Sequence, residues 1–345
     1  MNSIIGNKKI RQSNFELLRI ISMFMVLVLH ADFIALGEPN KMDIISSPWI
    51  SSIKVLLEMA SIVAVNVFVL ISGWFGIRPS VKGFLNFVFQ CLFFSIGIYL
   101  IMILVGNQEF SIRGLISCFT FNGSYWFVLA YLCLYILSPI LNVFLQHTHK
   151  RTQLVVLISF FTFQTLFAWL LDGAIFLRRG YSTLSFIGLY LLINYIKKYL
   201  DYKNLNCGLC YLLLIILSAV LFLLAKYLGC YFITNRLFEY SNPIVIVSSV
   251  SLVLFFSTIK IHNIIINYIA KSCFAVYLLH CNSYIWEFFL GTIRGNMINQ
   301  TPLEYFHVFA IIVIWFVLAI LIDQVRLLLW NLVLKLVSPL LERWT

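Results

Sequence analysis

Residues 17–37 read LLRIISMFMVLVLHADFIALG, and this stretch decides the fold class. A helix needs about 20 mostly apolar residues to cross the hydrocarbon core of a bilayer, and the stretch is long enough to do so. It follows a basic N-terminal tail and has no clear small-residue cleavage site, so we expect a retained helix and not a cleaved signal peptide. The sequence therefore predicts an all-α membrane protein, provided that similar runs follow.

Nine further apolar runs do follow, separated by short polar breaks. We expect helices near residues 17–37, 58–77, 84–105, 125–146, 153–171, 181–196, 208–228, 243–259, 268–290 and 304–324. No insert of the size of a soluble domain interrupts them, which predicts a single integral-membrane domain over residues 1–345 with about ten transmembrane helices. Residues 326–345, in which Arg326, Lys335 and Arg343 lie among Leu and Trp, are expected to form a cytoplasmic amphipathic tail.

The composition excludes several classes of protein. The 345 residues are 62% hydrophobic and only 11% charged, whereas soluble domains carry about 25% charged residues. This excludes an ordinary soluble protein, a disordered chain and a secreted disulfide scaffold. The eight cysteines are scattered, and the single pair Cys207 and Cys210 has no second pair or His cluster nearby in the sequence. We therefore expect no metal site.

The net charge of +11 has a topological explanation. With the N-terminus placed in the cytoplasm, 15 of the 24 Lys and Arg residues fall in cytoplasmic segments, 8 fall in outer loops, and Arg19 lies within the first helix. This bias follows the positive-inside rule and predicts both termini in the cytoplasm and an even number of helices. Because the positive charge is spread over many loops, we expect the lipid bilayer and not a nucleic acid as the partner.

Three ionisable residues fall in the first helix, where burial in a membrane makes them costly and suggests function. Arg19 and His30 are eleven residues apart, so they point to the same side of a helix and lie about 16.5 Å apart along its axis. Glu16 is three residues before Arg19 and can pair with it. One polar stripe thus runs from the cytoplasmic edge to beyond the middle of the membrane. The alternative is an interfacial ion pair and a His that only packs.

Other polar residues are weaker candidates. His280 follows Tyr277-Leu278-Leu279 and is expected at mid-membrane depth, although it is equally expected as a packing residue. Ser72 precedes Gly73 near the end of the second helix, and Arg78 and Lys82 follow on the cytoplasmic side. The fourth helix starts at the outer side after Asn122-Gly123-Ser124. No G-x-S-x-G, H-E-x-x-H or P-loop sequence is present, so serine hydrolase, zincin and ATPase signatures are missing.

Four segments in order resemble the integral-membrane acyltransferase family 3, which modifies bacterial surface glycans. Arg19, ten residues and His30 match the Arg-x10-His hallmark of the first helix. Val67-Phe68-Val69-Leu70-Ile71-Ser72-Gly73-Trp74 resembles the aromatic-rich segment, and Tyr125-Trp126-Phe127 resembles the Tyr-Trp-Phe helix. Ser272-Cys273-Phe274-Ala275-Val276-Tyr277-Leu278-Leu279-His280 resembles the late Tyr-Leu-Leu-His helix. The chain is most similar to stand-alone polysaccharide O-acetyltransferases, although relatives often have more basic residues after the second helix.

The resemblance implies transfer of an acetyl group from cytoplasmic acetyl-CoA to a sugar hydroxyl of a surface polysaccharide or its lipid-linked precursor, in a bacterial cytoplasmic membrane. We expect His30 as the general base, with Arg19 and Glu16 in the same catalytic group. Arg19, Arg78 and Lys82 are expected to meet the CoA phosphates. The remaining candidates are Ser72, Asn66 and Tyr125 as oxyanion donors near the cofactor or substrate, Tyr125 and Trp126 as sugar-binding aromatics, and His280 as a second base or substrate ligand.

Two other functions remain open on the sequence. A flippase or transporter for a lipid-linked glycan would use Glu16, Arg19 and His30 as a proton relay, but matched broken helices are not evident in the sequence. A membrane glycosyltransferase or glycan polymerase would use acidic residues of the first outer loop, where Asp32, Glu38 and Asp43 are found. Consumption of acetyl-CoA distinguishes the acyltransferase from both.

Overall fold

The computed structural model describes residues 11–121 and 125–341, the last five by their backbone alone. Within these residues every regular element is a helix, which confirms the predicted all-α class. Seven helices are long and apolar enough to cross a membrane, or eight if one sharply bent pair counts as a single span. The count of ten and the cytoplasmic location of both termini remain predictions. Asn122, Gly123 and Ser124 lie outside the described residues.

Each predicted apolar run contains at least one helix, and short helices lie between several of them. The elements are α1 (Ser13–Leu29), η1 (His30–Leu36), α2 (Lys41–Ser46), α3 (Pro48–Ser61), α4 (Ala64–Phe75), α5 (Val81–Leu104), α6 (Ile112–Thr120), α7 (Trp126–His147), α8 (Lys150–Phe163), η2 (Gln164–Leu170), η3 (Ile175–Gly180), α9 (Thr183–Tyr199), α10 (Cys207–Leu228), α11 (Tyr231–Leu237), α12 (Pro243–Thr258), α13 (Ile264–Ala270), α14 (Phe274–His280), α15 (Ser283–Gly295) and α16 (Pro302–Leu341).

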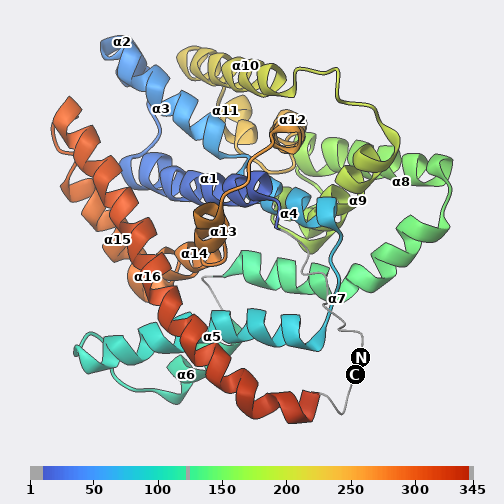
Figure 1. Cartoon of the computed structure of the whole chain (residues 1–345). Helices are drawn as coiled ribbons and strands as arrows, with labels where there is room; N and C mark the ends of the chain where they lie inside the picture. The colour runs from blue at the N-terminus through green and yellow to red at the C-terminus, as the bar shows by residue number, and fades with distance from the viewer. Residues whose placement is uncertain (1–10, 122–124, 342–345) are drawn as a thin grey trace.

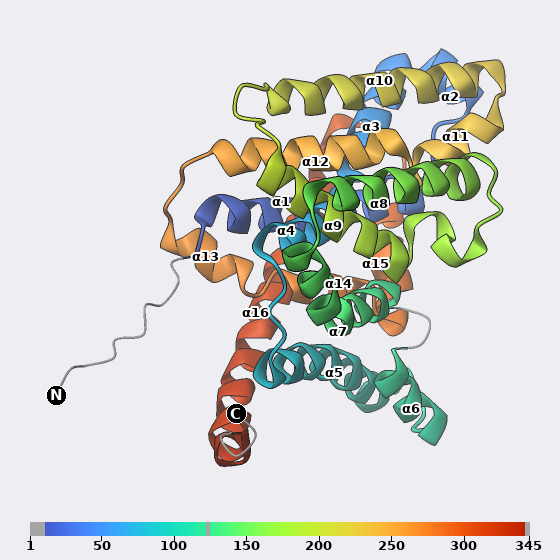
Figure 2. The same ribbon diagram turned by 90° about the vertical axis from the view of Figure 1, so that its right-hand side faces the viewer.

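Helix α1 runs through the middle of the bundle (Figures 1 and 2). It packs against α3, α4, α12, α13, α14 and α16, so elements from both halves of the sequence surround it. The polar side chains of α1 are therefore turned toward protein and not toward lipid, which is where intramembrane ionisable groups are tolerated. This position makes α1 the element around which a site is built.

The predicted single helix over residues 268–290 is wrong. The chain instead forms α13 and α14, breaks after His280, and turns by 89° into α15. The break is stabilised by polar groups: Asn282 caps α15 by accepting from Tyr284 N–H (3.0 Å), and its side-chain amide donates to the Tyr125 hydroxyl (2.8 Å). That hydroxyl donates in turn to Leu278 O (2.6 Å), a carbonyl near the end of α14. Polar backbone groups freed by the break are thus partly satisfied by side chains, as burial requires.

The last helix also differs from expectation. The sequence predicts that it ends near residue 324 and gives way to an amphipathic tail, but α16 continues without a break through Arg326 to Leu341. The charged residues do not end the helix because they are paired inside the bundle. Asp323 and Arg326 are 0% and 1% exposed, form a bidentate ion pair, and hydrogen-bond to Gln90 and Asn86 of α5. Buried charges of this kind are stable only when they are paired.

The Ser72-Gly73 dipeptide has a packing role in this fold. Helix α4 packs closely on α9, and a Cβ atom at Gly73 would lie 2.5 Å from Ile193 Cγ2 and 2.8 Å from Tyr190 O. The second contact is with backbone, which a rotamer change cannot relieve. Gly73 therefore sets how near the two helices approach each other, as small residues do in membrane bundles.

We expect Gly73→Ala to lower the stability of the detergent-solubilised protein by about 1–3 kcal/mol, because added atoms in a close-packed contact force helices apart. Thermal unfolding followed by circular dichroism measures the effect. Gly97→Ala in α5 is the matched control: its Cβ has no heavy atom within 4 Å, so the substitution should be neutral or slightly stabilising. Equal melting temperatures for both variants would contradict this account of Gly73.

Candidate functional site

His30 lies at the junction where α1 passes into the π-helical turn η1. The π-helical hydrogen-bonding pattern is rare and frequently marks functional sites. The two segments together still form one apolar span, Ser13–Leu36, so the change of winding repositions side chains without breaking the helix. His30 is thereby presented toward α14 rather than toward lipid.

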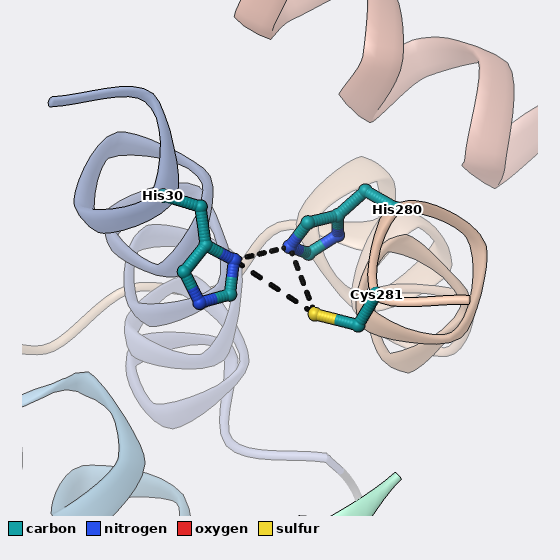
Figure 3. A group of neighbouring side chains, drawn as sticks. All are labelled: His30, His280 and Cys281. Atoms are coloured by element: carbon teal, nitrogen blue, oxygen red, sulfur yellow. Dashed lines mark hydrogen bonds between the residues drawn. The ribbon is translucent and has the colours of Figure 1, made fainter. Parts of the chain in front are cut away.

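The structure brings His30 against His280, two residues that the sequence separates by 250 positions. His30 Nδ1 lies 2.8 Å from His280 Nε2 (Figure 3). The other ring nitrogen of His280, Nδ1, lies 2.5 Å from Val276 O. A carbonyl only accepts, so His280 carries its proton on Nδ1 and presents a lone pair on Nε2. His30 then donates from Nδ1, and its Nε2 keeps a free lone pair. We assign both tautomers from this network.

Cys281 is the third member of the cluster and was not among the residues expected from the sequence. Its Sγ lies 3.3 Å from His280 Nε2 and 3.8 Å from His30 Nδ1 (Figure 3). Such a His-His-Cys set is a possible ligand set for zinc. However, the two nitrogen atoms are 2.8 Å apart, whereas tetrahedral coordination with Zn–N bonds of about 2.0–2.1 Å would separate them by about 3.3 Å. The spacing fits a hydrogen-bonded imidazole pair better than a metal centre.

A cavity of about 400 Å³ adjoins the cluster, within the usual size range of small-molecule sites. His30 and Cys281 line it, with Met23 and Val26 on the same helix as His30. Most of the remaining wall is aromatic. These residues are Phe68, Trp126, Phe127, Tyr240, Phe274, Tyr277 and Trp286. The cavity therefore combines one imidazole pair with broad aromatic faces, which suits a substrate that has both a reactive hydroxyl and an apolar ring face.

Glu16 and Arg19 form the predicted ion pair one to two turns into α1. Arg19 Nη1 donates to both carboxylate oxygens of Glu16, at 3.0 and 3.1 Å, and Arg11 approaches Glu16 to 3.5 Å. Glu16 is buried and the Arg19 side chain is 33% exposed. The eleven-residue separation from His30 corresponds to about 16.5 Å of helix. The structure therefore places this pair at the far end of α1 from the imidazoles and not in contact with them.

Three other predicted residues have hydrogen-bond partners in the structure. Ser72 donates to Phe68 O (3.0 Å) and shares a hydrogen bond with Tyr131 (2.9 Å), and Asn66 donates to Tyr240 O (3.1 Å). The Tyr125 hydroxyl is used at the α14–α15 break. None of these three lines the 400 Å³ cavity, but Trp126 does.

Arg78 and Lys82 are exposed on the α4–α5 connection and the first turn of α5, and neither lines the cavity beside the imidazole pair. Lys197 of α9 is a basic residue at this end of α4 that was not among the CoA contacts expected from the sequence. Its Nζ donates to Trp74 O (2.6 Å), and Trp74 packs on Phe15 of α1 at 5.3 Å. The start of α1 and the end of α4 thus share one basic region. The sequence feature that could have pointed to Lys197 is the pair Lys197-Lys198 in the last turn of α9.

The three acidic residues that favoured a glycosyltransferase have structural roles. Asp32 lies in η1 and is 3.9 Å from Lys54, which sits within α3 and not in the predicted outer loop. Glu38 pairs with Lys226. Asp43 completes a capping box at the start of α2. Each of the three therefore has a partner of its own, and none of these contacts joins it to another of the three, so the contacts do not support the acidic group on which that alternative rested.

Comparison with known proteins identifies the family. The family profile described as an acyltransferase domain, that of acyltransferase family 3, matches residues 12–322. Searches of curated proteins and of solved structures found no match. The profile covers α1, the imidazole pair and the first half of α16, and therefore most of the chain. The chain belongs to acyltransferase family 3 and is a multi-pass membrane acyltransferase.

Proposed function

We propose that this membrane acyltransferase moves an acetyl group from cytoplasmic acetyl-CoA to a sugar hydroxyl of a surface polysaccharide or of its lipid-linked precursor, in a bacterial cytoplasmic membrane. The observation that carries the proposal is the oriented imidazole pair beside an aromatic-lined cavity. An alcohol needs a base to attack a thioester, and aromatic faces suit sugar rings. His30 has the free lone pair and is the base.

The proton path follows from the tautomers. The sugar hydroxyl gives its proton to His30 Nε2 as its oxygen attacks the acetyl carbonyl carbon. The imidazolium that forms is stabilised by the hydrogen bond from His30 Nδ1 to His280 Nε2, and His280 is held in place by Val276 O. Breakage of the C–S bond releases the CoA thiolate, which takes the proton from His30. The roles parallel those of His and its orienting partner in other acyl-transfer enzymes.

The donor is expected to enter from the basic end of α1. CoA is polyanionic, and its phosphates would remain at the water-accessible edge near Arg19, Arg78, Lys82 and Lys197. About 16.5 Å of helix separates Arg19 from His30, so the pantetheine arm would extend along α1 to bring the thioester to the imidazole pair. Glu16 holds the Arg19 guanidinium in one orientation through its two hydrogen bonds. No metal ion is required by this scheme.

The direct test uses purified protein in nanodiscs with radiolabelled acetyl-CoA and glycan extracted from the cells that make the protein. We expect transfer of label by the wild type, and a loss of at least about 100-fold with His30→Ala, in line with the contribution of general-base catalysis. Arg19→Ala should weaken acetyl-CoA binding, whereas His30→Ala should leave binding intact. Absence of both acetyl-CoA binding and glycan labelling in the wild type would refute the proposal.

His280 acts through His30 and is a positioning residue. His280→Ala removes the acceptor that keeps the His30 proton on Nδ1, so we expect kcat to fall by about 100-fold with little change in acetyl-CoA binding. His280→Gln is the informative companion, because its side-chain oxygen can still accept a hydrogen bond from His30. Recovery of part of the rate in the Gln variant but not in the Ala variant supports positioning. Identical losses in both would point to a structural defect.

Cys281 is not required as an acyl carrier in this scheme. The nearest lone pair to its thiol, on His280 Nε2, already accepts from His30, so no base is free at that position to take the thiol proton. We therefore expect Cys281→Ala to retain activity within about threefold of the wild type. Intact-mass analysis after incubation with acetyl-CoA alone should show no acetylated enzyme. A stable acetyl adduct on Cys281 would overturn direct transfer.

A further inference from the structure

A second cavity of about 600 Å³ adjoins the first at the N-terminal ends of α7 and α9. Trp126 lines both cavities, so its indole forms the wall between them. Arg178, Tyr181, Ser182 and Thr183 line the second cavity as well. The charge distribution of the chain predicts that this end of the bundle lies on the outer side of the membrane. An acceptor arriving from outside would meet this cavity before it meets His30.

The backbone that presents Arg178 has an unusual conformation. Arg178 (φ 46°, ψ 44°) and Arg179 (φ 55°, ψ 29°) are both left-handed, a conformation that costs free energy in residues with a Cβ. The surroundings hold it in place: Ser241 N–H donates to Arg179 O (3.2 Å). Gly180 (φ +99°) approaches Tyr240 and Ser241 so closely that a Cβ atom would lie 2.6 Å from Tyr240 Cβ. Strain maintained in this way is characteristic of functional segments.

The two adjacent arginines differ in their partners. Arg179 forms two hydrogen bonds with Asp172 (3.1 and 2.6 Å), and Arg236 pairs with Glu239 (2.9 Å) and Asp172 (3.3 Å). The hydrogen bonds from Arg179 hold the pKa of the Asp172 carboxyl below its ordinary value. This group contains two positive and two negative charges and is therefore neutral. Within the residues that the structure describes, the side chain of Arg178 has no ion pair or hydrogen bond, so its guanidinium adds to the cavity one positive charge that these residues do not compensate.

The aromatic neighbours indicate what kind of molecule carries the matching charge. Tyr181 lies between Trp126 and Tyr240, with ring centroids 4.7 and 4.5 Å away. These rings form a continuous aromatic wall from the second cavity, which Arg178 lines, to the first cavity, which His30 lines. A sugar chain lying on this wall would place one residue near His30 and a neighbouring residue near Arg178.

We propose that Arg178 and this aromatic wall form an acceptor subsite for an anionic group, a carboxylate or a phosphate, one sugar residue or linkage away from the acetylated hydroxyl. The inference rests on the proposed function, because it names the class of glycan that the enzyme uses. A guanidinium binds either anion through two parallel hydrogen bonds, so a uronic acid and a phosphodiester or lipid-linked phosphate share the required chemistry.

The test uses the full chain in nanodiscs with radiolabelled acetyl-CoA and one glycan preparation in three forms: untreated, carboxyl-reduced and dephosphorylated. We expect one treatment to lower transfer by the wild type about tenfold, which identifies the anion. Arg178→Ala should raise the KM for the untreated glycan about tenfold with little change in kcat, and Arg178→Lys should recover part of this loss. Arg113→Ala, an exposed arginine of α6 that lies outside both cavities, is the matched control and should resemble the wild type.

The decisive comparison is the Arg178→Ala variant on the form of the glycan that has lost its anion. Wild type and variant should then be equal, because the group that Arg178 binds is absent. An equal loss of activity by Arg178→Ala on all three forms of the glycan would mean that Arg178 has only a structural role. Equal use of the three forms by the wild type would exclude an anionic acceptor. Either result overturns the inference and leaves acetyl transfer standing. Failure of the wild type to label any form would refute the proposed function itself.

Discussion

The break between α14 and α15 is the constraint on which the candidate site depends. Polar backbone groups inside a membrane protein must find partners within the protein, so a helix can be interrupted only where side chains replace the missing hydrogen bonds. Tyr125 and Asn282 supply them, by bonding to each other and to the ends of the two helices. The break leaves His280 as the last residue of α14 and Cys281 in the turn, where Cys281 lines the cavity.

The same requirement explains how the other buried polar groups are arranged. Asp323 and Arg326 are fully buried, and each satisfies the other while both hold α16 against α5. The imidazole pair is different. Val276 O holds it at the His280 end, and His30 Nε2 keeps a free lone pair at the other end. Glu16 and Arg19 are intermediate, paired but partly accessible. The groups that can still bind or react with another molecule are Arg19 and His30. They lie on α1 and at its junction with η1, where the Arg-x10-His motif is found.

Much of the membrane organisation was predictable. Each of the ten apolar runs contains a helix in the structure, because a run of about 20 apolar residues has few alternatives in a bilayer. The Arg19 and His30 spacing and the Glu16 and Arg19 pair were likewise local properties of one helix. The predictions failed where a distant partner decides the outcome. Residues 268–290 are divided among α13, α14 and α15, with a sharp break after α14 that Tyr125 and Asn282 stabilise, and α16 continues because α5 accepts its charges.

The sequence by itself determined the fold class, the approximate position of the helices and the presence of a basic and histidine-bearing first helix, since these follow from hydropathy and helical periodicity over short stretches. Only the tertiary structure decided that His280 hydrogen-bonds to His30, that Cys281 lies beside them, that Ser72 and Asn66 hydrogen-bond away from the cavity, and that the Arg178 side chain, unlike that of Arg179, has no ion pair among the described residues. The physical reason is that tautomers and ion pairs depend on distances of about 3 Å between residues up to 250 positions apart, and such distances are set by how the helices pack and not by their local periodicity.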